Sequence, residues 1–238
     1  MFRHKGKRRS YGHNLRLASM LSFVAGIVNI AGLLSAGVLT TNVTGHFAFF
    51  SRTFMEEDFP KAVIYLGFLL SFLAGAFFSN LISEIMLRIK ENLSYVAPII
   101  LEIILLMSVT CLRVTHREII ACMLLFAMGL QNALVTKVSQ SVVRTTHLTG
   151  LFTDLGIELS QLFFYKRNIE KITLKRGIYL KLSIIIFFFA GGIAGGFGYH
   201  HLQLKVLIIA SACLLAALLY DYLLLRFYLL KRRVAHKH

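Results

Sequence analysis

Residues 17–39 are LASMLSFVAGIVNIAGLLSAGVL, a stretch that contains no Asp, Glu, Lys or Arg. An α-helix needs about 20 consecutive apolar residues to cross the hydrocarbon core of a membrane. The stretch is therefore long enough to span a bilayer, and it is too long for the apolar region of a cleaved signal peptide. It predicts a first transmembrane helix that the protein retains.

Comparable apolar runs follow at residues 62–86, 95–112, 119–135, 178–199 and 206–225. Of the 238 residues, 57% are hydrophobic and 16% are charged, and the mean hydropathy is +0.70. Soluble domains carry about 25% charged residues, so this composition excludes a soluble globular enzyme. The alternating pattern of transmembrane β-strands does not occur. We therefore expect an all-α, polytopic membrane bundle of about six transmembrane helices.

Two shorter segments, residues 44–55 and 149–165, each follow a cluster of Thr and Gly. We expect two short discontinuous helices there, because about twelve helical residues cover roughly 18 Å of a 30 Å core. Alternatively, both segments cross the membrane and raise the count to about eight spans. The excess of Lys and Arg places both termini in the cytoplasm in either arrangement, so charge does not choose between them.

The basic residues predict how the chain is organised around its membrane domain. The formal net charge is +15, and the Lys and Arg residues lie between the apolar runs. Such a distribution favours contact with anionic lipid head groups rather than with nucleic acid. We expect a basic cytoplasmic arm at residues 1–16, one integral membrane domain at residues 17–225, and a basic cytoplasmic tail at residues 226–238.

An internal repeat divides the membrane domain into halves at residues 17–112 and 118–225. Residues 23–29 (FVAGIVN) align with residues 126–132 (FAMGLQN), and residues 40–47 (TTNVTGHF) align with residues 145–152 (TTHLTGLF). The shared residues are Phe, Gly, Asn and Thr, whereas chance similarity of apolar helices would match Leu and Ile. Three spans per half would make the repeat inverted in the membrane, and four per half would make it parallel.

The motif Gly26-x-x-Asn29, with its second copy at Gly129 and Asn132 and the Thr-Gly pairs that follow, resembles the YoaK-like family of bacterial multi-pass membrane proteins. The resemblance covers about residues 17–225. Proteins of that family usually carry Asp where this chain has Asn29 and Asn where it has His46. The resemblance implies a bacterial inner-membrane protein of about six spans, and it implies no particular substrate.

The repeated motifs predict a binding site between the halves. Each Thr can cap a helix start, and each Gly lets a ligand approach the backbone. If both short helices begin inside the bundle, their positive dipole ends favour a small polar or anionic solute. The candidate substrate-binding residues are Asn29, Thr41, Thr44, Gly45, Gln131, Asn132, Thr146, Thr149 and Gly150. The alternative is that they only pack and hydrogen-bond helices together.

Three acidic residues are candidates for ion coupling. Glu102 lies in the middle of an apolar run, where an ionisable group is costly and often functional. Asp154 and Glu158 are four residues apart, so they share one helix face. The alternatives are a neutral Glu102 bonded to a neighbouring helix, and an Asp154–Glu158 face that lies among lipid head groups.

Taken together, the sequence predicts a transporter or permease for a small polar or anionic solute. The alternatives are a membrane scaffold or sensor without transport and, third, a lipid-handling enzyme. No P-loop, HExxH, nucleophile elbow or dinucleotide motif occurs in the sequence, so we expect no enzyme activity, cofactor or metal. Stripes of small residues, Gly67 to Ser83 and Gly191 to Gly196, could pack helices within the chain or join copies in a homo-oligomer.

Overall fold

The computed structural model describes residues 11–89, 94–139, 143, 145–164 and 168–235, and over these ranges the regular structure is entirely helical. The helices are α1 (Tyr11–Ala36), α2 (Val43–Met55), α3 (Phe59–Ile89), α4 (Val96–Thr110), α5 (Arg117–Ser139), α6 (Leu148–Gln161), α7 (Asn168–Leu202), the short 3₁₀ helix η3 (Gln203–Val206) and α8 (Leu207–Ala235). Residues 1–10 of the predicted basic arm and residues 236–238 of the predicted basic tail lie outside the described residues. The expected short helices are present as α2 and α6.

The membrane character of the chain is evident from its long helices. Four helical stretches among the described residues are long and apolar enough to cross a membrane: Tyr11–Ala36, Phe59–Ile89, Arg117–Ser139 and Glu170–Leu223. The last stretch has 54 residues and contains most of α7, all of η3 and α8 up to Leu223, while Val96–Thr110 is apolar but shorter. The all-α polytopic fold is thus confirmed, whereas the number of spans stays a prediction.

Several helices extend beyond the apolar runs at their basic ends. The first helix begins at residue 11 instead of 17, α7 begins at 168 instead of 178, and α8 continues to 235, through most of the predicted tail. Lys and Arg are good helix formers, so in α7 and α8 helix propensity does not stop where hydrophobicity does. The extension of α1 (residues 11–16, YGHNLR) contains only one such residue, Arg16. The basic side chains also tie helices together: Arg16 donates to the Tyr220 hydroxyl at 2.9 Å, and the Arg176 guanidinium lies 5.9 Å from the Tyr11 ring centroid.

The first helix ends three residues earlier than its apolar run. Gly37 adopts a positive φ of 72°, a conformation that glycine accepts without a Cβ penalty. Its N–H donates to the Leu33 carbonyl at 3.0 Å, and the Val38 N–H donates to the Gly32 carbonyl at 3.3 Å. The chain then turns, and a β carbon on Gly32 would overlap the methyl group of Thr40. The break therefore depends on two glycines.

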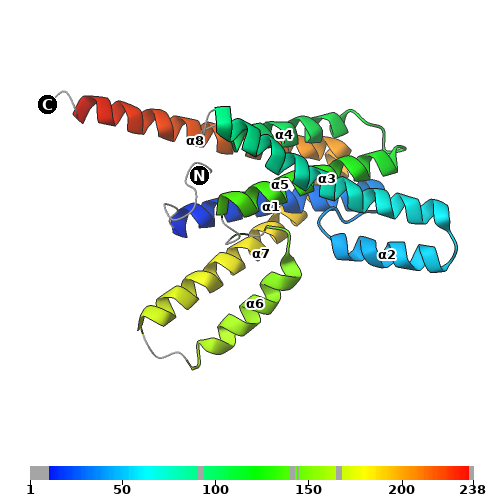
Figure 1. Ribbon diagram of the computed structural model, residues 1–238, viewed down its shortest axis with the longest axis horizontal. Helices are drawn as coiled ribbons and strands as arrows, with labels where there is room; N and C mark the ends of the chain where they lie inside the picture. Colours follow the sequence, from blue (N-terminus) through cyan, green and yellow to red (C-terminus); the bar gives the residue numbers. More distant parts are fainter. Residues whose placement is uncertain (1–10, 90–93, 140–142, 144, 165–167, 236–238) are drawn as a thin grey trace.

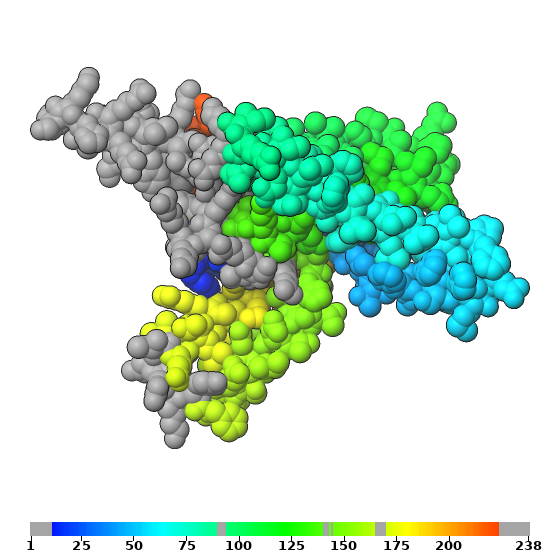
Figure 2. All heavy atoms as spheres, in the orientation of Figure 1, coloured from blue at the N-terminus to red at the C-terminus, as the bar shows by residue number. Residues whose placement is uncertain are grey.

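The long helices pack in two main pairs, α1 with α7 and α3 with α5. Helix α4 lies against α5 and α8, and α1 also contacts α5 and α8. The short helices lie outside this bundle, α2 on α3 and α6 on α7. Figure 1 shows the α2–α3 and α6–α7 hairpins projecting in different directions, and Figure 2 shows them as two separate lobes.

Helices α1 and α7 cross at backbone contact distance. A β carbon on Gly26 would overlap the Phe188 carbonyl oxygen, and one on Gly191 would overlap the Phe23 carbonyl oxygen. Further along, a β carbon on Gly195 would lie 2.9 Å from the Cα of Ile27, so the two helices run in the same direction. Each glycine thus faces the phenylalanine of the other helix across one close crossing.

Helices α3 and α5 repeat this arrangement. A β carbon on Gly75 would overlap the Phe126 carbonyl oxygen, and one on Gly129 would overlap that of Phe72. Every one of the four glycines follows its phenylalanine by three residues. The small residues of α3 and α7 therefore serve, at least at Gly75 and Gly191, to pack helices within the chain. An added β carbon would meet nothing within 4 Å at Gly67 or Gly192.

Candidate functional site

Each copy of the repeated motif contains one hydrogen-bonded Asn–Thr pair. In the first copy, the Asn29 side-chain oxygen accepts from the Thr41 N–H at 3.2 Å and from the Thr41 hydroxyl at 3.0 Å. In the second copy, the Asn132 side-chain oxygen accepts from the Thr146 hydroxyl at 2.7 Å. Each Asn therefore holds the turn that follows its own helix, and not the motif of the other half.

The residue that precedes the paired threonine is also a threonine in both copies of the motif, Thr40 in the first and Thr145 in the second. Thr40 and Thr145 are both fully buried. The hydroxyl of each has no hydrogen-bond partner among the described residues. An unpaired buried hydroxyl is costly unless water or another group satisfies it. The two turns thus carry equivalent buried polar groups that the sequence analysis did not single out.

The caps of the short helices differ from the expectation. We expected Thr44 and Thr149 to cap α2 and α6, and this prediction is wrong. The residue that caps α2 is Asn42, whose side-chain oxygen accepts the Gly45 N–H at 3.0 Å. Thr44 lies inside the helix and is exposed. Asn42 precedes Val43 directly, in the position from which a side chain can reach the free N–H groups. The N-cap of α6 is His147, which makes no side-chain cap bond, and Thr149 is exposed.

The two predicted glycines have a matched local role. A β carbon on Gly45 would lie 2.7 Å from the Asn42 side-chain nitrogen. One on Gly150 would lie 2.8 Å from the His147 Nε2 atom. In both copies the missing side chain lets the capping residue fold over the first turn of the short helix.

Gln131 is fully buried and lies at the contact of α5 with α1. Its Nε2 donates to the Leu21 carbonyl oxygen at 2.9 Å, while its side-chain oxygen has no partner among the described residues. This bond joins two helices that are far apart in sequence. Gln131 is therefore engaged in the packing of the bundle.

The three acidic candidates lie in different environments. Glu102 in α4 is 1% exposed, and its Oε1 has no hydrogen-bond partner among the described residues. Glu158 in α6 accepts from Lys181 of α7 at 2.7 Å, in an ion pair that is only partly exposed. Asp154 is exposed. The second Glu158 oxygen, Oε2, is likewise buried without a partner among the described residues. Of the three, only Glu102 combines a fully buried side chain with the absence of an ion pair among the described residues, which is the environment expected of an ion-coupling group.

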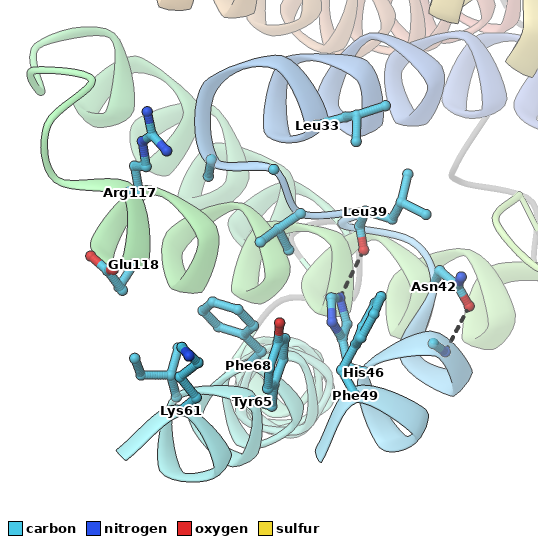
Figure 3. Close-up of a pocket in the computed structure, with 15 residues that line it drawn as sticks. Leu33, Leu39, Asn42, His46, Phe49, Lys61, Tyr65, Phe68, Arg117 and Glu118 are labelled. Carbon is cyan, nitrogen blue, oxygen red and sulfur yellow. Dashed lines mark hydrogen bonds between the residues drawn. The ribbon is translucent and has the colours of Figure 1, made fainter. Parts of the chain in front are cut away.

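A cavity of about 520 Å³ lies beside the first helix break (Figure 3). Its walls come from the end of α1 and the following turn, from α2, from the first part of α3 and from the first turn of α5. It contains Asn42, Gly45 and His46 of the first motif and no residue of the second. This cavity thus joins the first motif to the start of α5, and a cavity common to both motifs stays a prediction.

His46 forms one inner wall of the cavity. It is 3% exposed, its Nε2 lies 2.9 Å from the Leu39 carbonyl oxygen, and its ring packs edge-on against Phe68. A carbonyl oxygen only accepts, so Nε2 is assigned the proton. Burial lowers the pKa of His46, which favours the neutral ring. The other ring nitrogen, Nδ1, has no partner among the described residues.

Charged residues gather at the opposite end of the cavity. They are Lys61 at the start of α3 and Arg117 and Glu118 at the start of α5. The Lys61 ammonium contacts the Asp58 carboxylate at 2.5 Å. Sequence reasoning missed these residues, as it missed Tyr65 and Asn42, because only the packing of α5 near the α2–α3 hairpin brings them to one place.

Comparison with known proteins agrees with this architecture. Residues 17–220 match the family described as DUF1275, protein of unknown function. The chain belongs to this family. It is also 27% identical over 186 residues to the UPF0700 transmembrane protein YoaK of Bacillus subtilis (strain 168), which covers 74% of this chain and 80% of that protein. The resemblance to the YoaK-like family is therefore confirmed. No solved structure matches the chain significantly.

Proposed function

We propose that this DUF1275 protein is a carrier for a small polar or anionic solute in a bacterial inner membrane. The observation that supports the proposal is the cavity of about 520 Å³ at the point where α1 is interrupted. Transporters commonly bind their substrates near discontinuous helices, between two structurally related halves. Here the cavity is lined by α1, α2 and α3 of the first half and by the start of α5.

The proposal includes an inverted repeat of about six spans, in which α2 and α6 are short helices that do not cross. Two sets of contacts support equivalence of the halves: the Asn–Thr bonds after α1 and α5, and the glycine crossings of α1 with α7 and α3 with α5. In Figure 1, α1 and α5 run in opposite directions. A pseudo-twofold axis in the membrane plane accounts for all of these features.

A scaffold or sensor without transport is the second candidate. It is favoured by the engagement of both asparagine oxygens within their own halves, which leaves them occupied by protein groups. A scaffold needs no solute path, so it gives no role to the cavity beside α2. A substitution that fills the cavity therefore distinguishes the two functions, because it should block transport and leave a scaffold unaffected.

The test uses purified protein in liposomes that are placed in a small-molecule extract, with the trapped contents analysed by mass spectrometry. A carrier accumulates at least one small polar or anionic solute above protein-free liposomes. We expect Ala36→Phe, which puts a large side chain into the cavity wall, to abolish most of this uptake. Ala48→Phe, an exposed position on α2 away from the cavity, is the matched control and retains it.

Two outcomes would contradict the proposal. Equal uptake by Ala36→Phe and the unmodified protein, with both well folded, would remove the cavity from the solute path. No accumulation of any solute by the unmodified protein, under either an imposed proton gradient or a membrane potential, would support the scaffold.

A further inference from the structure

The interior of the cavity beside α2 is aromatic. The rings of Phe49 and Tyr65 stack with centroids 5.3 Å apart and planes 20° apart. Phe68 lies edge-on to Tyr65 at 5.9 Å. Figure 3 shows these rings on one side of the cavity, with Leu33 and Leu39 on the other. Two apolar walls that face each other in this way suit a flat, apolar body.

The Tyr65 hydroxyl adds a second polar group to this interior, beside the His46 ring. In Figure 3 the Tyr65 hydroxyl points from α3 towards the end of α1, into the space between the two walls. The Tyr65 hydroxyl can donate a hydrogen bond to a group on a bound molecule or accept one from it.

The charged end of the cavity, which contains Lys61, Arg117 and Glu118, is where a charged group would be recognised. Lys61 is already paired with Asp58, whereas Arg117 makes no ion pair within the part of the chain that the structure describes. Arg117 is also the first residue of α5, a helix of 23 residues whose N-terminal N–H groups carry partial positive charge. Glu118, the next residue of α5, also lines the cavity and would repel a bound anion.

We propose that the cavity binds a small aromatic monocarboxylate, with its ring between the Phe49–Tyr65 stack and Leu33, and its carboxylate at Arg117. Guanidinium groups bind carboxylates strongly and with defined geometry. The cavity volume of about 520 Å³ lies within the usual range for small-molecule sites and suits a body of one or two fused rings. The inference rests on the proposed function, because it takes the cavity as the solute site.

The direct test is equilibrium binding of 2-naphthoate to the purified full chain, followed by the fluorescence anisotropy of the naphthoate. The chain has no Trp to interfere, and protein-free detergent micelles supply the blank. We expect saturable binding that Arg117→Gln weakens by about tenfold or more. Arg117→Lys should restore part of the affinity. Arg113→Gln, the same change in the exposed loop before α5 and outside the cavity, should leave binding unchanged.

A charge series tests the chemical class of the ligand. Neutral 2-naphthalenemethanol and cationic 2-naphthylmethylamine have the same ring system, and we expect both to bind more weakly than the carboxylate. Tighter binding of the amine would show that Glu118 determines the charge preference at the charged end of the cavity, and it would overturn the proposal. So would an unchanged affinity in Arg117→Gln, or displacement of naphthoate by phosphatidylglycerol but not by other aromatic carboxylates.

Binding and transport can fail separately. Naphthoate binding without uptake of any solute would leave the site intact and contradict the carrier. Uptake that requires the cavity, combined with no naphthoate binding, would leave the carrier and contradict the ligand class inferred here.

Discussion

Gly191→Ala is expected to lower the free energy of unfolding by about 1–3 kcal/mol, because an inserted methylene or methyl group in a tightly packed contact must displace its neighbours. The neighbour in this case is the backbone of α1 at Phe23, which cannot rotate away as a side chain could. Gly192→Ala is the matched control. Its β carbon would meet nothing within 4 Å, so we expect little change in the free energy of unfolding and no loss of helix, since Ala is the better helix former.

The measurement is equilibrium unfolding of the purified variants in mixed micelles, followed by circular dichroism. The equivalent pair in α3 gives an independent replicate, with Gly75→Ala destabilising because it meets α5 and Gly67→Ala neutral because it faces open space. Similar stabilities within each pair would mean that the crossings are not at backbone contact distance.

The second large effect is expected at the helix breaks. Asn29→Leu removes the oxygen that accepts both the Thr41 N–H and the Thr41 hydroxyl. A fully buried donor left without a partner costs about 1–3 kcal/mol. Because the two bonds to Asn29 are only part-buried, we expect a loss of about 1 kcal/mol. Asn132→Leu removes one accepted bond, from Thr146, and we expect a smaller loss. The double variant should lose approximately the sum, since the two turns lie in different halves.

Exposed hydroxyls at the same helix starts provide the control. Thr44→Val and Thr149→Val change residues that lie in the first turns of α2 and α6 but are exposed. We expect each to change stability by less than about 0.5 kcal/mol. A loss as large as that of Asn29→Leu would show that these threonines, and not the asparagines, hold the breaks.

Much of the helical architecture could be predicted because hydrophobic runs and helix lengths are local properties. The apolar run at residues 17–39 became α1, and the Thr-Gly clusters correctly marked the starts of two short helices. The cap of α2 was misassigned because Asn42 and Thr44 are both good capping residues, and sequence alone does not fix which one lies at the boundary. The early end of α1 followed from the positive φ of Gly37, one of several glycines in that run.

The candidate site could be predicted only in part, because it depends on contacts between distant segments. The repeat identified Asn29 and Thr41 as candidate residues, but it did not predict that they bond to each other across twelve residues. The cavity, in contrast, needs Arg117 near the α2–α3 hairpin, which no local pattern encodes. The repeat also suggested that its two copies would meet. In the structure α2 packs on α3 and α6 on α7, so each copy is held within its own hairpin region.

The sidedness of the two hairpin tips tests the inverted repeat most directly. The three native cysteines, Cys111, Cys122 and Cys213, are free and are first replaced by Ser. Single cysteines are then placed by Glu56→Cys, between α2 and α3, or Phe163→Cys, after α6, and labelled in cells with a membrane-impermeant maleimide. The inverted repeat predicts that residue 56 is labelled from outside and residue 163 only after the membrane is permeabilised. Protection of both positions in intact cells would indicate a parallel repeat of about eight spans and contradict the account.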